Sequence, residues 1–452
     1  MSDATTTVIS DSVGLQDADS GAVTRQQWKW SALAGMASYL DAGSIVALGA
    51  GLAAFRMAFG LNEGAVGALQ AVGPNAIGCA VGAFIGGWLG DKLGRKRIYQ
   101  WDLLVYAAGI LCVALAVHPA MLFIGTFVVG VAVGADVPTS LALVGEFAPS
   151  KARGKLLGFT QVAWCLGPSA VLWLAMAVAP LDTPEMARKI GISILGIRIL
   201  FLHLFLVAMI TWALRRGLAE SARWKAAAAV SKDQVKALFS PANFRAMLWT
   251  GTIYLFWNLA AGTVGAFGAY FNHILLGGKN VSETTTQIVS TGITSLSFFL
   301  TLLGTVFLFM RFSDRSFAAR KWLWGAGALL QITAWGMLMF VPFTITTILI
   351  NTLLWGVGAA LAGEAFYKVF SQELFPTMHR GTAQGITFGV ARTLLGIWSF
   401  IAPTLIDDKH PNFRMIALML TIFLLISGVV GFFGMPNTAG KSLEQIESER
   451  HA

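Results

Sequence analysis

Charged residues are scarce in this chain. Of its 452 residues, 12% are charged and 56% are hydrophobic, whereas a soluble globular chain is nearer ~25% charged. Cysteine is scarcer still, since Cys79, Cys112 and Cys165 are the only three and all lie within apolar runs. Neither these nor the six histidines have the spacing of a metal site. The shortages argue against a soluble fold, an extracellular disulfide and a metal centre.

Long apolar stretches, by contrast, recur along the whole chain. Each has about twenty residues, enough to cross ~30 Å of hydrocarbon as a helix. The alternating strands of a membrane barrel would give a different and weaker pattern. We therefore predict an all-α integral membrane protein with 12 transmembrane helices. The expected spans are 30–54, 67–90, 98–117, 121–147, 155–180, 191–214, 247–275, 287–311, 321–341, 345–371, 382–405 and 413–435.

The net charge of +9 is distributed unevenly between the loops. If the N-terminus lies inside, most Lys and Arg of the loops fall on the cytoplasmic side, for example in 92–97, 151–155 and 215–236. This asymmetry is the positive-inside rule, so the basic charge indicates membrane orientation rather than a nucleic-acid partner. We expect a multi-pass protein of the plasma membrane (in bacteria, the cell inner membrane) with both termini cytoplasmic. The polar residues 1–27 lack the apolar core of a cleavable signal.

The sequence also repeats itself. EFAPSKARG at 146–154 returns as ELFPTMHRG at 373–381, 227 positions later, and GDKLGRKR at 90–97 is echoed by SDRSFAARK at 313–321. Two related halves with a cavity at the membrane midplane are typical of a transporter that rocks around a central site. The expected division is a disordered tail 1–27, a six-helix half 28–214, a cytoplasmic linker 215–245, a second six-helix half 246–435 and a cytoplasmic tail 436–452.

Five motifs, in order along nearly the whole chain, resemble a known family. GGWLGDKLGRKRIY (86–99) resembles the loop between helices 2 and 3 of the major facilitator superfamily. EFAPSKARG, LAESARW (218–224), ELFPTMHRG and MPNTAGKSLEQIE (435–447) resemble its sugar-porter branch and related metabolite–proton symporters. The resemblance implies the major facilitator fold, with two pseudo-symmetric six-helix halves. It also implies secondary active transport by alternating access, with a proton gradient as energy source, no cofactor and no enzyme activity.

By the same resemblance, charges at the helix ends form a cytoplasmic gate that links the halves while that side is shut. The alternative is ordinary solvated loop charge, worth ~0–1 kcal/mol a pair. A bistable network is what a conformational switch needs, and this favours the gate. The expected gate residues are Asp91, Arg95, Glu146, Arg153, Glu220, Arg223, Glu373 and Arg380.

A carboxylate stands within the first apolar span. Asp41 lies in LDAGSIVALG, which resembles the first helix of sugar–proton symporters. Because a low dielectric disfavours the charged form, Asp41 is expected to load and release the coupled proton, and Asp136 is the second candidate; a structural ion pair is the alternative. Symporters of this branch carry a partner arginine early in helix 4, where this chain has Thr126. Three alternatives are therefore open: Asp41 has another cationic partner, Arg198 or Arg392; it is protonated more readily; or it shares a proton with Asp136.

Several residues are candidates for binding substrate. Gln161, in GFTQVAWCLGP, matches the helix 5 glutamine that bonds sugar hydroxyls in sugar porters. Tryptophan adds stacking, although it also marks membrane interfaces and helix packing. Glu364 and Lys368 share one helix face, and a local neutralising pair is the alternative there. The predicted set is Gln161, Asn258, Trp257, Trp355, Trp398, Arg198, Glu364, Lys368 and Arg392.

These residues favour a monomeric importer of a small hydrophilic metabolite, a sugar or polyol, by proton symport. The alternative is symport of an organic anion, such as a sugar acid or aromatic carboxylate, which wants a cation in the cavity. Arg198, Lys368 and Arg392 would supply it. The helix 7 signature of sugar porters is also absent, since YLFWNLAAGTVGAFGAYFN stands in its place. A uniporter, an exporter, a sensor and a membrane enzyme are less well supported.

Overall fold

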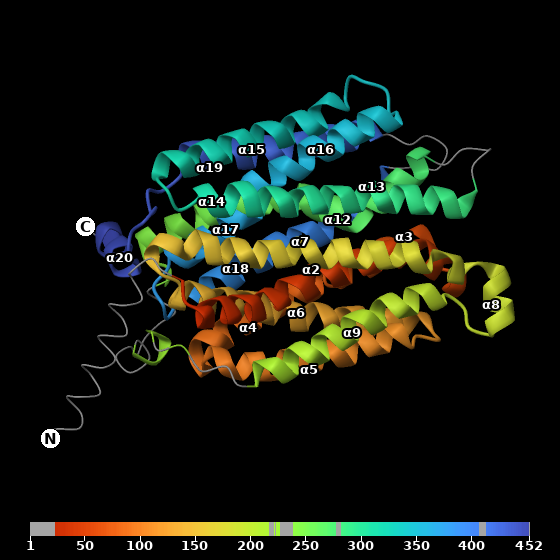
Figure 1. Cartoon of the computed structure of the whole chain (residues 1–452), viewed down its shortest axis with the longest axis horizontal. Coiled ribbons are helices and arrows are strands. Elements are labelled where there is room, and N and C mark those ends of the chain that lie inside the picture. Colours follow the sequence, from red (N-terminus) through yellow and green to blue (C-terminus); the bar gives the residue numbers. More distant parts are fainter. Residues whose placement is uncertain are drawn as a thin grey trace.

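The computed structural model describes residues 23–216, 221, 223–226, 238–276, 282–405 and 413–451, and these contain helices and no strands. Helices are the expected solution, because a chain in lipid must satisfy its backbone hydrogen bonds within each segment. The described helices assemble into twelve rods that run along the long axis of the molecule (Figure 1). The predicted all-α fold with 12 transmembrane helices is confirmed.

The first six rods are built from the N-terminal half of the chain. The longest helix of this half, α2, begins at a capping box between Thr24 and Gln27 and ends at Gly60, whose φ of 63° suits a left-handed cap. The short elements η1 (Ser150–Ala152), η2 (Ala179–Asp182) and α8 (Pro184–Ile190) join the rods. The rods are α2 (Arg25–Phe59), α3 with α4 (Glu63–Val72 and Ile77–Leu93), α5 (Arg95–Ala114), α6 (Pro119–Phe147), α7 (Arg153–Val178) and α9 (Leu195–Arg215).

The other six rods follow in the same order along the chain. They are α12 (Pro241–Leu276), α13 (Glu283–Gly304) with a π-helical turn (Thr305–Phe309) and α14 (Met310–Phe312), α15 (Phe317–Met337), α16 with α17 (Ile345–Leu361 and Glu364–Glu373), α18 (Arg380–Thr404) and α19 (Phe413–Phe433). A last helix, α20 (Leu443–His451), lies at one end of the bundle (Figure 1); this is called the α20 end below. The halves meet where α2 packs on α12, α4 on α18 and α7 on α13.

Two of the expected spans, 67–90 and 345–371, are broken rather than continuous. In the first, α3 and α4 are separated at Gly73–Ala76, where Pro74 has no backbone N–H to donate. In the second, α16 and α17 are separated at Gly363, whose φ of +111° strains any other residue. A Cβ at Gly363 would also lie 2.2 Å from Trp257 Nε1. Breaks of this kind free polar backbone groups inside a transporter.

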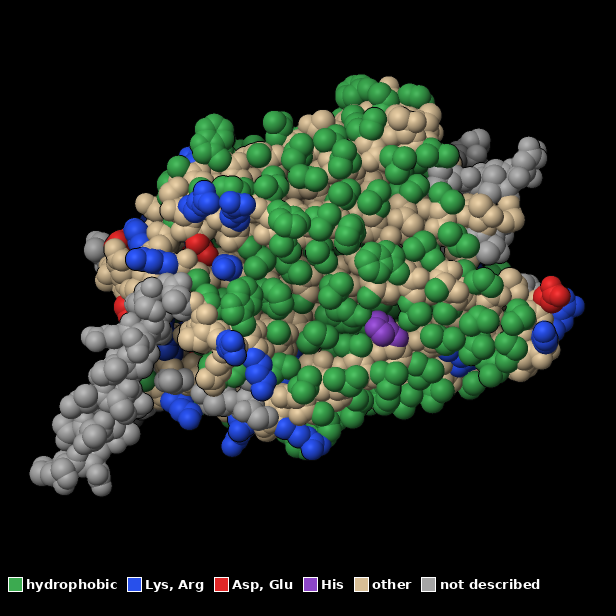
Figure 2. Space-filling model, viewed as in Figure 1, with side chains coloured by type: hydrophobic (Ala, Val, Ile, Leu, Met, Phe, Trp, Pro, Cys, Tyr) green, Lys and Arg blue, Asp and Glu red, His purple; other side chains and the backbone are tan. Residues whose placement is uncertain are grey.

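The outer surface of the bundle suits a lipid environment. Figure 2 shows hydrophobic side chains covering the middle of the visible face, with Lys and Arg gathered mainly near the α20 end. Large exposed apolar residues include Trp101, Phe307 and Leu329. Within the described ranges, nine helical stretches are long and apolar enough to cross a membrane. The chain is therefore a multi-pass membrane protein, while the domain limits predicted from the repeats stay a prediction.

A stripe of glycines lets α4 and α6 approach backbone to backbone. A Cβ at Gly82 would lie 2.0 Å from the Val131 carbonyl oxygen, and one at Gly86 would lie 2.3 Å from Ala135 Cα. Conversely, a Cβ at Gly134 would meet the Cys79 carbonyl oxygen at 2.0 Å. Small residues at such spacing are the usual way in which membrane helices pack closely.

Replacing a glycine of this stripe is expected to destabilise the fold. In Gly82→Ala the new methyl group has no room, and overpacking of this kind costs about 1–3 kcal/mol. Gly292→Ala is the matched control, since its Cβ would first meet Met176 Sδ at 3.6 Å. The melting temperature of the purified protein in detergent, followed by tryptophan fluorescence, should fall in Gly82→Ala only. Equal melting temperatures of the two variants would contradict this packing.

Candidate functional site

The carboxylate of Asp41 lies at the centre of the bundle, where the halves meet. Its side chain is 1% exposed. Asp41 Oδ2 accepts a hydrogen bond from Trp164 Nε1 at 3.2 Å and lies 3.6 Å from Arg392 Nη2. Asp41 and Trp164 belong to the first half, whereas Arg392 lies on α18 in the second. Of the partners considered for Asp41, the structure brings Arg392 to it.

The break between α3 and α4 holds the other side of Arg392. Arg392 Nη1 donates to both the backbone oxygen and the Oδ1 of Asn75, each at 3.1 Å. Asn75 in turn donates through Nδ2 to the Gly262 carbonyl oxygen at 3.3 Å. The interrupted helix therefore supplies a backbone carbonyl that a continuous helix would have used internally. The guanidinium is fixed between Asp41 and Asn75.

A second ion pair lies close by on α17. Glu364 Oε1 is 3.4 Å from Lys368 Nζ, and Lys368 Nζ donates to Gln161 Oε1 at 2.8 Å. Glu364 directly follows the break at Gly363, so it stands at the N-terminus of α17, where a helix favours negative charge. The charges of Glu364 and Lys368 are close enough to act on Asp41. Gln161 belongs to α7, so this cluster also joins the two halves.

A small cavity adjoins these ion pairs. Its polar lining comes from Asn75, Asn258 and Arg392, and its aromatic lining from Trp164, Trp257 and Phe298. Several buried polar atoms around it have no hydrogen-bond partner among the described residues. They are Asp41 Oδ1, Glu364 Oε2, Asn258 Nδ2 and Arg392 Nε. The region therefore offers two oxygen acceptors and two N–H donors that a small ligand could satisfy.

Three of the other predicted binding residues lie elsewhere. Trp398 donates to Thr263 Oγ1 at 2.7 Å and packs on Phe423. Trp355 packs on Trp335 and lines a separate cavity within the second half. Arg198 donates to the carbonyl oxygens of Ala114 and Ala116 at 2.6 and 2.8 Å. The structure does not bring these three residues to the small cavity beside Arg392.

Trp257 has a double role. Its ring lines the cavity, while its Nε1 donates to Gln331 Oε1 at 2.8 Å. Gln331 Nε2 donates to the carbonyl oxygens of Gly358, in the last turn of α16, and Ala362, at the break between α16 and α17. Gln331 therefore positions Trp257 and satisfies the broken helix at once.

Asp136, the second candidate for proton coupling, is not part of this cluster. Its Oδ2 lies 2.9 Å from Arg215 Nη1 at the last residue of α9. Arg215 also donates to the Leu33 carbonyl oxygen on α2. Asp41 and Asp136 therefore belong to two separate buried sites.

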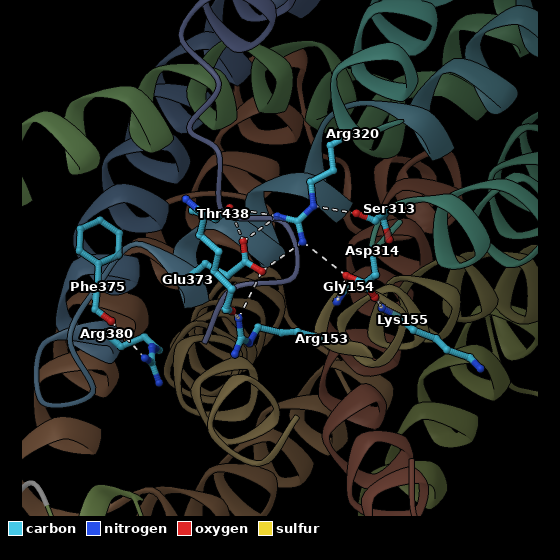
Figure 3. A network of polar contacts seen from close by, with 11 residues as sticks. Arg153, Gly154, Lys155, Ser313, Asp314, Arg320, Glu373, Phe375, Arg380 and Thr438 are labelled. Atoms are coloured by element: carbon cyan, nitrogen blue, oxygen red, sulfur yellow. Dashed lines mark hydrogen bonds and ion pairs between the residues drawn. The ribbon is translucent and has the colours of Figure 1, made fainter. Parts of the chain in front are cut away.

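A charge network joins the halves at the α20 end, and Figure 3 shows its main part. Glu373 is its centre: Oε2 lies 2.7 Å from Arg320 Nη1 and accepts a hydrogen bond from Thr438 at 2.6 Å, while Oε1 lies 3.4 Å from Arg153 Nη1. The side chains of Glu373, Arg153 and Arg320 are completely buried. Arg153 begins α7 in the first half, so Glu373 holds the two halves together here.

The rest of the network uses the corresponding residues of the first half. Arg95 lies 2.9 Å from both Asp91 and Glu146, and Arg380 lies 3.7 Å from Glu146. Arg95 also donates to the Thr377 carbonyl oxygen at 2.9 Å. Glu146 is therefore shared between an arginine of its own half and one of the other half, as Glu373 is.

Two carboxylates cap helices across the boundary between the halves. Asp91 accepts hydrogen bonds from the backbone N–H of Gly381 and Thr382 at the start of α18. Asp314 accepts from the N–H of Gly154 and Lys155 at the start of α7, at 3.0 and 2.8 Å. A carboxylate at a helix N-terminus is favoured by the helix dipole. Burial raises the pKa of Asp314 above its ordinary value, although Arg320 acts in the opposite direction.

Sequence reasoning brought most of this network together but missed three members. Arg320, Asp314 and Thr438 were not among the predicted gate residues. The repeat pairing GDKLGRKR with SDRSFAARK contained a signal for Asp314, since it aligns with Asp91. Arg223 lies at the edge, 3.5 Å from the exposed Glu444, and Glu220 lies outside the described residues. The gating role of the whole set stays a prediction.

Removing Arg153 is expected to open the bundle at the α20 end. Breaking a buried ion pair costs about 3–5 kcal/mol, and each 1.4 kcal/mol changes a population ratio about tenfold. Ser371, which is buried beside the network on α17, is replaced by cysteine in a background without native cysteines. A hydrophilic thiol reagent should label S371C at least tenfold faster after Arg153→Ala.

The control for this measurement is Lys151→Ala, because Lys151 is exposed two residues before Arg153. The labelling rate of S371C should not change in that variant. An unchanged rate after Arg153→Ala would mean that the network does not hold the α20 end shut.

Comparison with known proteins identifies the family to which this chain belongs. The sequence model of the family described as "Sugar (and other) transporter" matches residues 32–449. The chain is 35% identical to the minor myo-inositol transporter IolF of Bacillus subtilis (strain 168), with 92% of each chain covered. It is 24% identical to the niacin transporter NiaP of Acinetobacter baylyi, covering 82% of this chain and 85% of the relative.

Solved structures agree with this result. The proton:xylose symporter XylE bound to 6-bromo-6-deoxy-D-glucose superposes with a TM-score of 0.76 at 18% identity, covering 94% of this chain and 98% of XylE. The TM-score is lower, 0.67, for the inward open conformation of XylE from E. coli. The fold is therefore that of the major facilitator superfamily, and the chain belongs to its sugar transporter family, whose members are transporters and not enzymes.

Proposed function

We propose that this protein imports a neutral sugar or polyol together with protons by alternating access. It acts in the plasma membrane, with both chain termini and the α20 end in the cytoplasm. The positive-inside distribution of Lys and Arg supports this orientation. The relative IolF carries the name of a myo-inositol transporter, which supports a polyol as substrate.

One observation carries the choice of a neutral substrate: the cations of the central site are already matched by acids. Arg392 faces Asp41, and Lys368 faces Glu364. Arg198 was a third candidate cation for binding an organic anion, but its guanidinium donates to backbone carbonyl oxygens instead. While Asp41 is ionised, an organic anion would therefore enter a site with no net positive charge, where its own charge lacks a counter-ion.

The polar atoms left without partners fit hydroxyl groups. A hydroxyl can donate to Asp41 Oδ1 or Glu364 Oε2 and accept from Asn258 Nδ2. A carboxylate can only accept, and it would be repelled by the two acids. The remaining donor, Arg392 Nε, is charged and would favour an anion. Trp164 and Trp257 add flat apolar surfaces against which a sugar ring can pack.

Competition in proteoliposomes tests this preference with one matched pair of compounds. Glucose and glucuronate differ by a carboxylate, and both compete against exchange of labelled myo-inositol. We expect glucose to inhibit and glucuronate to be inactive. In Glu364→Gln, Lys368 loses its acid, so inhibition by glucuronate relative to glucose should rise about tenfold, as expected of a hydrogen bond to a freed charge.

The control for this competition is Glu185→Gln, an exposed position on α8, which should leave the preference unchanged. Retained exchange of myo-inositol shows that Glu364→Gln is folded. Stronger inhibition of the wild-type protein by glucuronate than by glucose would overturn the neutral assignment and favour the organic anion.

Asp41 is the residue proposed to couple proton movement to transport, because its carboxylate forms an ion pair between the two halves. While ionised, it pairs with Arg392 across the interface between α2 and α18. Protonation removes that attraction, so loading a proton loosens the central contact at the same time as the substrate binds. The two hydrogen bonds from Arg392 to Asn75 do not depend on Asp41, so they would still solvate the guanidinium after Asp41 is protonated.

Asp41→Asn is expected to separate exchange from accumulation. The amide preserves the shape and can accept from Trp164, so exchange of labelled substrate should persist. Accumulation driven by an imposed proton gradient should be lost, since the amide carries no titratable proton. Asp182→Asn is the control, because Asp182 caps α9 through Gly196 and lies two residues before α8, which is at the opposite end of the bundle from α20 (Figure 1). Full accumulation by Asp41→Asn would end this assignment.

A further inference from the structure

A second pair of carboxyl groups is buried within the first half, apart from the substrate cavity. Asp102 on α5 and Asp136 on α6 are 6% and 3% exposed. The two residues line the same small pocket. Arg215 Nη1 lies 3.8 Å from Asp102 Oδ2 and 2.9 Å from Asp136 Oδ2. Asp102 was not among the residues predicted from the sequence.

The charges of this cluster do not balance if both acids are ionised. Arg215 is the cation beside the pair within the described part of the chain. Its guanidinium also lies over the ring of Tyr99, 4.5 Å from the centroid. Two carboxylates and one guanidinium leave one negative charge in a low-dielectric interior. Such a charge is costly, and a carboxyl group usually becomes neutral instead.

Two carboxyl oxygen atoms without hydrogen-bond donors indicate where a proton could bind. Asp102 Oδ2 and Asp136 Oδ1 are buried and accept no hydrogen bond from the described residues. A carboxylate cannot donate to another carboxylate. A single proton shared by the pair would provide the donor that is missing and would neutralise the excess charge.

Groups from four helices surround the pair, and of these Tyr106 also lies near Asp41. From α5 come Tyr99 and Tyr106, from α6 Ser140, and from α9 Arg215. From α2 come the apolar side chains of Ala37 and Leu40 and the carbonyl oxygen of Leu33. Leu33 precedes Asp41 by eight residues, which is about 12 Å along a helix. The pair is therefore a site of its own, nearer the α20 end.

We propose that Asp102 and Asp136 bind one shared proton and form a second proton site, distinct from Asp41. In the orientation proposed above, the proton comes from the cytoplasm. Arg215 connects this site to α2, since it binds both acids and the Leu33 carbonyl oxygen. Loss of the proton would change the field around Arg215, so the site links the packing of α2 to cytoplasmic pH without touching the substrate.

Infrared spectroscopy of the full-length protein in lipid vesicles tests the proposal directly. A protonated carboxyl group has its own carbonyl stretching band, and isotopic labelling of the aspartate side-chain carboxyl separates Asp from Glu. The measurement uses the Asp41→Asn background at neutral pH and no substrate. We expect a protonated aspartic acid band that is lost on adding Asp102→Asn, because the amide then donates to Asp136 permanently.

Asp136→Asn is the second variant, and it should remove the same band if Asp102→Asn proves difficult to purify. Adding Asp182→Asn, the matched control, should leave the band in place. The absence of a protonated aspartic acid band from the Asp41→Asn background, or its survival in both pair variants, would overturn the proposal. Because no substrate is used, either result is independent of whether the protein transports a polyol with protons.

Discussion

Buried charge needs a partner, and in this protein the decisive partners come from the opposite half of the bundle. Asp41 meets Arg392 at the centre, and Glu373 meets Arg153 at the α20 end. Each pair is stable only while its two helices stay together, since an unpaired charge in this interior costs several kcal/mol. In the function proposed above, a proton at Asp41 is exchanged when the central contact opens.

The duplicated sequence explains why the contacts between the halves at the α20 end come in symmetric pairs. Asp91 caps α18 of the other half, and Asp314 caps α7 in return. Each carboxylate therefore binds the first turn of a helix that belongs to its opposite half. This reciprocal arrangement needs no sequence identity between the repeats beyond the acid and the helix start that it caps. It also accounts for the survival of Asp314 in a repeat whose glycines are gone.

The sequence predicted the number of helices and most network charges because hydropathy and repeated motifs are local signals. It did not predict the break at Gly363, because a hydropathy window records polarity and not backbone conformation. From the sequence alone, Arg392 and Arg198 are equally good candidates for the partner of Asp41, because their distances from Asp41 depend on the fold. Trp398 was taken for a cavity residue, since a tryptophan that packs and one that binds a ligand occur in the same kind of apolar run. Arg320 was missed because its repeat is degraded.

The most direct test follows external pH in a weakly buffered suspension of energy-depleted cells that produce the protein. Myo-inositol and glucuronate are added separately, and labelled uptake is recorded in parallel. If a neutral substrate enters together with a proton, the external medium should become more alkaline when myo-inositol is added. Its pH should not change when glucuronate is added. Alkalinisation with glucuronate alone, or uptake of myo-inositol without any change in pH, would contradict it.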